Sequence, residues 1–296
     1  MDFIRLIKPK YTLMKKILVP TDFSDHARNA GYYAVNLARQ MNASLALYHA
    51  YNVKISCKPP VYSYQFPLES MVNEESVWLE KQNQEKLRFF KETILRGRRE
   101  PNCSIVQQRA FVNDGISSYA EELEADLIVM GTRSNNQRSD MLIATTTWGV
   151  IKKSKVPVLA VPDGYTYNKI ENICFATNLS ESDASLIKSL ARIARIFDAQ
   201  LTVVHVADRS GDGDEQKIFD HFSRFIARHA DYDKLDFKLL VHSDVSEAIS
   251  NYLKNNKTDI IALTHEKRNI VEQLFHRSYT RKLALHSEIP ILAFTS

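Results

Sequence analysis

Residues 17–24 read Ile-Leu-Val-Pro-Thr-Asp-Phe-Ser, and a variant of this stretch, Ile-Cys-Phe-Ala-Thr-Asn-Leu-Ser, returns at residues 173–180. The two stretches begin at Ile17 and Ile173, which are 156 positions apart. Each is a continuous apolar run, typical of a buried strand, that ends in a small polar turn before a helical pattern. A repeated strand, turn and helix indicate two copies of one domain.

The repeat continues to the end of the chain, but its spacing shortens. The second strand repeats at 156 residues, whereas the two later strands repeat at 133, a difference of 23. The first copy therefore carries extra chain, which we place in a loop at about residues 52–76 because loops tolerate added length. The paired stretches are 43–50 with 199–206, 126–131 with 259–264, and 156–161 with 289–294.

These landmarks predict an extension at residues 1–13, a first domain at 14–163 and a second at 168–296. The strands are continuous apolar runs without a polar face, as in parallel sheets covered by helices on both sides. Helical patterns occupy residues 26–41, 74–96, 116–124 and 147–154 of the first copy. The fold class is therefore α/β, with two tandem doubly wound parallel five-stranded sheets of Rossmann-like type.

Composition is ordinary for a globular protein, with 44% hydrophobic and 25% charged residues. No apolar run approaches the roughly 20 residues that span a bilayer, and residues 1–13 do not resemble a secretory signal. Cys57, Cys103 and Cys174 have no paired or metal-ligand spacing, which suits a reducing compartment. We expect a cytoplasmic protein that binds neither membrane nor metal. The net charge of +4 is too small to indicate a nucleic-acid partner.

Ligands of such sheets bind beyond the carboxyl ends of the strands, where the strand order reverses. In the first copy, Asp22 follows the first strand and is a candidate ligand contact. Ser24 is better explained as the cap of the next helix. His49 and His205 end the second strands of the two copies, where a structural role is the simpler interpretation.

The chain resembles a tandem universal stress protein with two UspA-type domains. The resemblance is carried by residues 16–24, 125–133 and 156–162, and it covers nearly the whole chain. It implies a stress-response regulatory or binding protein in which the two domains pair as an intramolecular pseudo-dimer through their fifth strands, 156–161 and 289–294. Protein partners that the sequence does not identify, and a homodimer of two such chains, are compatible with this organisation.

The family contains members that bind ATP and members that do not. The resemblance implies that binders carry a loop of Gly, two residues, Gly, nine residues, Gly, then Ser or Thr, in which glycines let the backbone approach phosphates. The first copy keeps Gly131 and Thr145, but Ser134 and Ala144 replace the other two glycines. The candidate nucleotide-binding residues are Pro20, Thr21, Asp22, Ala50, Met130, Gly131, Arg133, Ser134, Ala144, Thr145 and Thr146.

This loop predicts weak ATP binding at most, with Mg²⁺ only if ATP binds. The threonines at 145–147 would serve equally as helix caps, and Arg133 and Arg138 as an exposed loop face. The second copy departs further, because Asn178 replaces the aspartate and no glycine remains. There Thr264, Lys267, Arg277 and Ser278 stand for Gly131, Ser134, Ala144 and Thr145, and we predict no ATP binding.

No Walker loop, dinucleotide fingerprint or Gly-x-Ser-x-Gly elbow is present, so we expect a protein that is not an enzyme. Two alternatives stay open. One is an ATP-binding switch or slow ATPase that uses the first copy. The other is a small-molecule or lipid carrier with Tyr62, Tyr64 and Phe66 as a lid, although these residues could equally form a short edge strand.

Overall fold

A computed structural model describes residues 15–52, 68–96, 101–132, 145–207, 214–265 and 289–295. The predicted extension at 1–13 and the aromatic residues at 62–66 lie outside these ranges. The first copy contains β1 (Lys16–Pro20), α1 (Asp25–Met41), β2 (Ser44–Tyr51), α2 (Leu68–Ile94), β3 (Cys103–Arg109), α3 (Val112–Glu122), β4 (Leu127–Thr132), α4 (Thr145–Lys153) and β5 (Val158–Pro162). The second contains β6 (Asn172–Ala176), α5 (Glu181–Phe197), β7 (Gln200–Ala207), α6 (Asp214–His229), β8 (Leu235–Val241), α7 (Val245–Asn255), β9 (Ile260–His265) and β10 (Ile291–Thr295).

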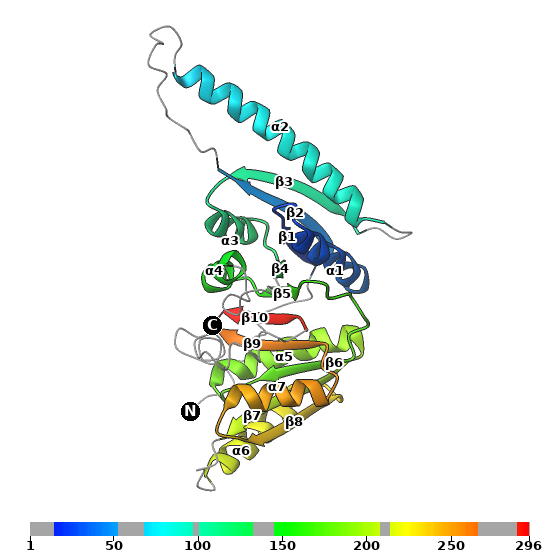
Figure 1. Ribbon diagram of the computed structural model, residues 1–296. Coiled ribbons are helices and arrows are strands. Elements are labelled where there is room, and N and C mark those ends of the chain that lie inside the picture. Colours follow the sequence, from blue (N-terminus) through cyan, green and yellow to red (C-terminus); the bar gives the residue numbers. More distant parts are fainter. Residues whose placement is uncertain are drawn as a thin grey trace.

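The strands form one continuous sheet in the order β3-β2-β1-β4-β5-β10-β9-β6-β7-β8. Neighbouring strands are parallel within each copy, whereas β5 and β10 pair antiparallel, with Leu159 opposite Leu292. Figure 1 shows this sheet running along the molecule from β3 to β8. The α/β class and the pairing of the fifth strands are confirmed, and that pairing fuses the two expected five-stranded sheets into one of ten strands.

Both faces of the sheet are covered by helices, which explains the strands' lack of a polar face. One core lies under α1, α2, α5 and α6 and continues across the β5–β10 junction, where Leu159, Leu292 and Phe294 are buried. Two smaller cores lie on the opposite face, under α3 and α4 in the first copy and under α7 in the second. The two copies therefore share hydrophobic packing as well as a sheet.

The helices begin close to their predicted positions, with one informative exception. α1 and α4 start within two residues of prediction and α3 starts four residues early. α2 starts at Leu68 and is 27 residues long, against 16 for its counterpart α6. The sequence predicted that the extra chain of the first copy forms a loop, but part of it extends α2. Residues 68–79 contain no glycine or proline that would stop a helix.

The duplication is also visible in the backbone. Asn42 and Asp198 end α1 and α5 with positive φ angles of 51° and 56°. Phe23 and Leu179, which follow β1 and β6, have φ angles of 66° and 63°. Large side chains rarely adopt this conformation, which costs of the order of 1 kcal/mol or more. Both copies therefore have a strained residue at the same position after their first strand.

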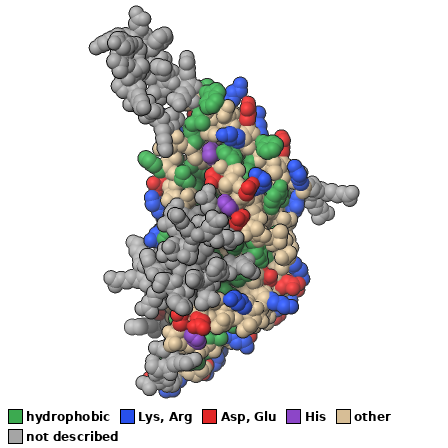
Figure 2. Space-filling model, in the orientation of Figure 1, with side chains coloured by type: hydrophobic (Ala, Val, Ile, Leu, Met, Phe, Trp, Pro, Cys, Tyr) green, Lys and Arg blue, Asp and Glu red, His purple; other side chains and the backbone are tan. Residues whose placement is uncertain are grey.

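On the surface in view, acidic and basic side chains are interspersed and do not gather into a patch of one sign (Figure 2). Within the described ranges, no helix combines the length and the apolar character needed to cross a bilayer.

Candidate functional site

The carboxyl ends of β1, β2 and β4 meet at the point where the strand order reverses. β1 lies between β2 and β4 and pairs with both in parallel, and open α/β sheets bind ligands at such a point. The structure brings together the predicted residues at the ends of these strands, here named the strand-end site. They are Pro20, Thr21, Asp22, Ala50, Met130 and Gly131.

The turn after β1 is held by its own side chains. The buried Thr21 hydroxyl accepts a hydrogen bond from the Phe23 N–H at 2.9 Å, and Asp22 Oδ1 accepts one from the Ser24 N–H at 3.0 Å. The Ser24 hydroxyl donates to the same Asp22 oxygen at 2.5 Å and accepts from the Ala27 N–H at 3.3 Å. The predicted capping role of Ser24 is confirmed. Asp22 is exposed, and among the described residues its Oδ2 accepts no hydrogen bond.

Gly131, near the end of β4, lies directly against the start of α1. A Cβ atom built on Gly131 would lie 2.6 Å from the His26 carbonyl carbon, still closer to its oxygen, and 3.2 Å from the Ala27 nitrogen. This close approach of strand and helix backbones requires glycine whether or not a ligand binds. Gly131 was predicted from phosphate binding alone, so the structure adds a packing role that the sequence did not indicate.

The first turn of α4 lies beside β4. The buried Thr147 hydroxyl donates a hydrogen bond to the Gly131 carbonyl oxygen at 3.1 Å, and the neighbouring Thr146 is half-buried. α4 begins at Thr145, and the backbone N–H groups in the first turn of a helix attract anions. Three other predicted residues, Arg133, Ser134 and Ala144, lie outside the described ranges.

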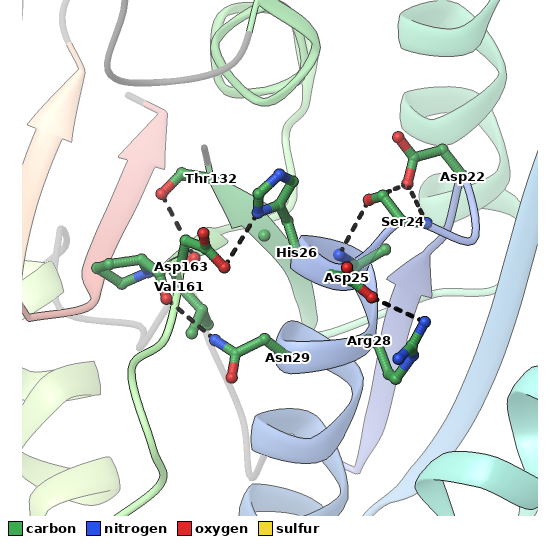
Figure 3. A network of polar contacts seen from close by, with 12 residues as sticks. Asp22, Ser24, Asp25, His26, Arg28, Asn29, Thr132, Val161 and Asp163 are labelled. Carbon is green, nitrogen blue, oxygen red and sulfur yellow. Dashed lines mark hydrogen bonds and ion pairs between the residues drawn. The ribbon is translucent and has the colours of Figure 1, made fainter. Parts of the chain in front are cut away.

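A polar network that the sequence did not indicate connects α1 to the end of β5 (Figure 3). His26 Nδ1 lies 3.0 Å from Asp163 Oδ1, and the Asn29 side-chain amide donates to the Pro162 carbonyl oxygen at 3.0 Å. The Thr132 hydroxyl donates to a carbonyl oxygen of β5 at 3.4 Å. These partners are over 100 residues apart in two of the three contacts, so no local motif could have revealed them.

His49, at the end of β2, has a structural partner, in line with the sequence interpretation. Its Nδ1 lies 2.7 Å from the Thr21 carbonyl oxygen, and its ring centroid is 4.5 Å from that of Phe23. Burial lowers the pKa of His49, and the charge of Lys86 lowers it further, while the hydrogen bond to Thr21 acts in the opposite direction. His205 makes the same contact in the second copy, with Nδ1 at 3.0 Å from the Thr177 carbonyl oxygen.

The second copy keeps the turn after its first strand, but the side chains of Asp183 and Thr264 occupy the space behind that turn. Asn178 Oδ1 accepts a hydrogen bond from the Ser180 N–H at 3.0 Å, as Asp22 does in the first copy. Asp183, which replaces Ala27, is fully buried and accepts hydrogen bonds from the hydroxyls of Thr177 at 2.6 Å and Thr264 at 3.4 Å. Thr264 stands where the first copy has Gly131. The counterparts Lys267, Arg277 and Ser278 lie outside the described ranges.

Comparisons with known proteins agree with this geometry. The sequence model of the universal stress protein family matches residues 14–162 and 169–295. The chain is 30% identical to the universal stress protein MJ0531 of Methanocaldococcus jannaschii over 156 residues, which is 53% of this chain and 86% of that protein. It is 22% identical to the universal stress protein Slr1230 of Synechocystis over 301 residues, covering 95% of this chain and all of that one.

A solved structure shares the complete architecture. The crystal structure of a universal stress protein from Archaeoglobus fulgidus has a TM-score of 0.65 and 15% sequence identity, covering 96% of this chain and 97% of its own. The likeness to that structure extends over both copies and shows the common fold. The family match to both copies establishes that the chain belongs to the universal stress protein family.

Proposed function

We propose that this chain is a stress-response binding protein that retains one weak adenine-nucleotide site, at the strand-end site of the first copy. Its second copy serves as a scaffold that completes the sheet. The ligand would be ATP, accompanied by Mg²⁺ when bound, and the two copies act as a permanent pseudo-dimer. In this proposal the first domain ends near residue 163 and the second begins near residue 168.

The difference between the two equivalent positions carries the proposal. In the first copy, the exposed Asp22 has one carboxylate oxygen without a hydrogen bond among the described residues, and the first turn of α4 contacts Gly131 through Thr147. In the second copy, Thr264 and Asp183 fill the space behind the turn with a buried hydrogen bond. A buried carboxylate there would repel the phosphates of a nucleotide. The residues of the first copy thus fit a nucleotide better than those of the second.

A binding role accounts for the first-copy site better than an enzymatic one. The Ser24 hydroxyl donates a hydrogen bond to the Asp22 carboxylate, as a nucleophile does to its base, but the Ser24 oxygen also accepts a hydrogen bond from the Ala27 N–H and so caps α1. These contacts show the Ser24 hydroxyl in a capping role at the start of α1. We therefore infer binding without turnover, which a phosphate-release assay on the full chain would check.

Calorimetric titration of the full chain with ATP and Mg²⁺ tests the nucleotide site. We expect one site per chain with a Kd weaker than about 10 µM. Asp22→Asn should abolish binding while preserving the turn, because Asn178 makes the same hydrogen bond in the second copy. The matched control Asn178→Asp should leave binding unchanged. Two sites per chain, unchanged affinity in Asp22→Asn, or no binding at millimolar ATP would each contradict the proposal.

Further assembly would use surfaces other than the fifth strands. β5 and β10 already pair with each other, so these edges are not available to a second chain. The outer strands of the ten-stranded sheet are β3 and β8, and unpaired strand edges are natural sites for protein contacts. A homodimer or a partner protein would therefore meet this chain at its outer strands or its helical layers.

A further inference from the structure

Each copy has a groove between its first and second helices, next to the turn that follows its first strand. The first groove, between the start of α1 and α2, has a volume of about 320 Å³, and the second groove, between the start of α5 and α6, about 430 Å³. The first is lined by Phe23, Arg28, Glu85, Lys86, Phe89, Phe90 and Thr93, and the second by Leu179, Ser180, Glu181, Ala184, Lys217, Ile218, His221, Phe222 and Phe225.

The two grooves are equivalent positions of the duplicated fold. Every lining residue of the first has a counterpart in the second, at 156 residues for the turn and first helix and at 132 for the second helix. Phe23 and Leu179, the strained residues with positive φ, hold the same place in both. Strain of this kind persists where the surrounding structure imposes it, and it gathers at binding sites. The groove therefore belongs to the domain and not to a chance gap in one copy.

The second groove is larger and more apolar than the first. Ala184 replaces Arg28, Ile218 replaces Lys86, and Phe225 replaces Thr93. Ile218 is 57% exposed although it lies at the edge of this groove. The volume and apolar lining are those of a site for a small organic molecule. The copy in which Asp183 and Thr264 occupy the space behind the turn thus has the larger and more apolar groove.

Charged groups at the rim indicate the ligand's polar end. Lys217 and His221 lie one turn apart on α6, on the face that carries Ile218 and Phe222. Lys217 pairs with Asp214 at 2.9 Å, but both side chains are more than three-quarters exposed, so this pair is weak and easily exchanged for another carboxylate. Glu181 lies on the opposite wall, so an anionic group would be placed on the α6 side.

We propose that the second groove binds an amphipathic carboxylate such as a medium-chain fatty acid. Its alkyl chain packs on Leu179, Ile218 and Phe222, and its carboxylate pairs with Lys217. Binding covers the exposed Ile218 and requires no covalent step. This site is separate from the proposed nucleotide site and does not depend on it.

Titration of the full chain with decanoate, followed by calorimetry and by NMR, tests this site. Saturable binding of one decanoate per chain is expected, and Ile218→Asn should weaken it roughly tenfold or more, since the aliphatic contact with the alkyl chain is replaced by a polar amide. Val241→Asn is the matched control, because Val241 is 60% exposed on β8 and does not line the groove. Absence of saturable binding, or equal loss in both variants, would overturn the proposal.

The carboxylate is tested separately. Lys217→Gln should weaken decanoate binding severalfold, and decan-1-ol should bind more weakly than decanoate. If decanol binds as tightly and Lys217→Gln has no effect, the ligand class is wrong.

The first groove allows the converse test, in which its differing lining residues are replaced by those of the second groove. Arg28→Ala and Lys86→Ile combined with Glu85→Lys, which supplies the counterpart of Lys217, should create a second decanoate site per chain. A stoichiometry that stays at one would refute the role assigned to the residues that distinguish the grooves. Circular dichroism and melting curves of each variant confirm that the fold is retained.

Discussion

Gly131→Ala should destabilise the protein through packing alone, without any ligand. The backbone of Gly131 has no positive φ, so alanine is conformationally allowed there. The obstacle is steric, because the added Cβ would lie 2.6 Å from the His26 carbonyl carbon. Non-bonded heavy atoms pack best at about 3.5 Å, so the start of α1 would have to retreat by roughly 1 Å.

Overpacking of this kind costs about 1–3 kcal/mol and occasionally more. Alanine also lowers the conformational entropy of the unfolded chain relative to glycine, which stabilises the fold by about 0.4–1 kcal/mol and offsets only part of the loss. At about 2–4 °C per kcal/mol for a chain of this size, the melting temperature should fall by several degrees. Urea denaturation and calorimetry of the ligand-free protein measure both quantities.

Gly149→Ala in α4 is the matched control. A Cβ there would meet the Asn113 side chain, 2.7 Å from its Cγ, and a side chain can rotate away whereas the α1 backbone cannot. Alanine also has a helix propensity about 1 kcal/mol better than that of glycine, so this variant should be close to wild type. If Gly131→Ala loses no more stability than Gly149→Ala, the packing argument is wrong. It also follows that a Gly131 variant is a poor probe of nucleotide binding.

Three further predictions concern buried groups. Asp183→Ala should cost about 2–5 kcal/mol in urea denaturation, because buried threonine hydroxyls lose their acceptor, whereas Glu181→Ala in the exposed first turn of α5 should change little; equal effects would argue against the buried network. His49 has a lowered pKa in the fold, so below about pH 6.5 the unfolded chain binds the proton more readily and stability should fall until the folded pKa is passed. His49→Gln should flatten this dependence in denaturation measured from neutral pH to about pH 5, and an unchanged slope would contradict the assignment. Burial raises the pKa of the Cys174 thiol to about 12, so iodoacetamide should leave it unmodified in the native protein and alkylate it after unfolding, as mass spectrometry would show; rapid native alkylation would refute its burial.

Local pattern was enough to predict many elements of the fold. The apolar run at 17–20, the polar turn at Thr21–Ser24 and the stripe of α1 are each encoded within a few residues, so strand, cap and helix could be predicted together. α2 was predicted to start at residue 74, six residues too late, although Pro67 directly before Leu68 is a local signal for a helix start. His26 and Asp163 were missed because they lie 137 residues apart and neither belongs to a motif.

The sequence by itself determined the duplication, the α/β class and the turn chemistry at Asp22 and Asn178, since periodicity and side-chain capping act over short stretches of chain. Tertiary structure alone decided what occupies the space beyond each strand end. The sequence pattern predicts Gly131 as a phosphate-loop glycine, but in the structure it is packed against α1. Thr264 and Asp183 occupy the equivalent space in the second copy. Those contacts join residues 81 or more positions apart, and their energies depend on distances that only the folded backbone sets.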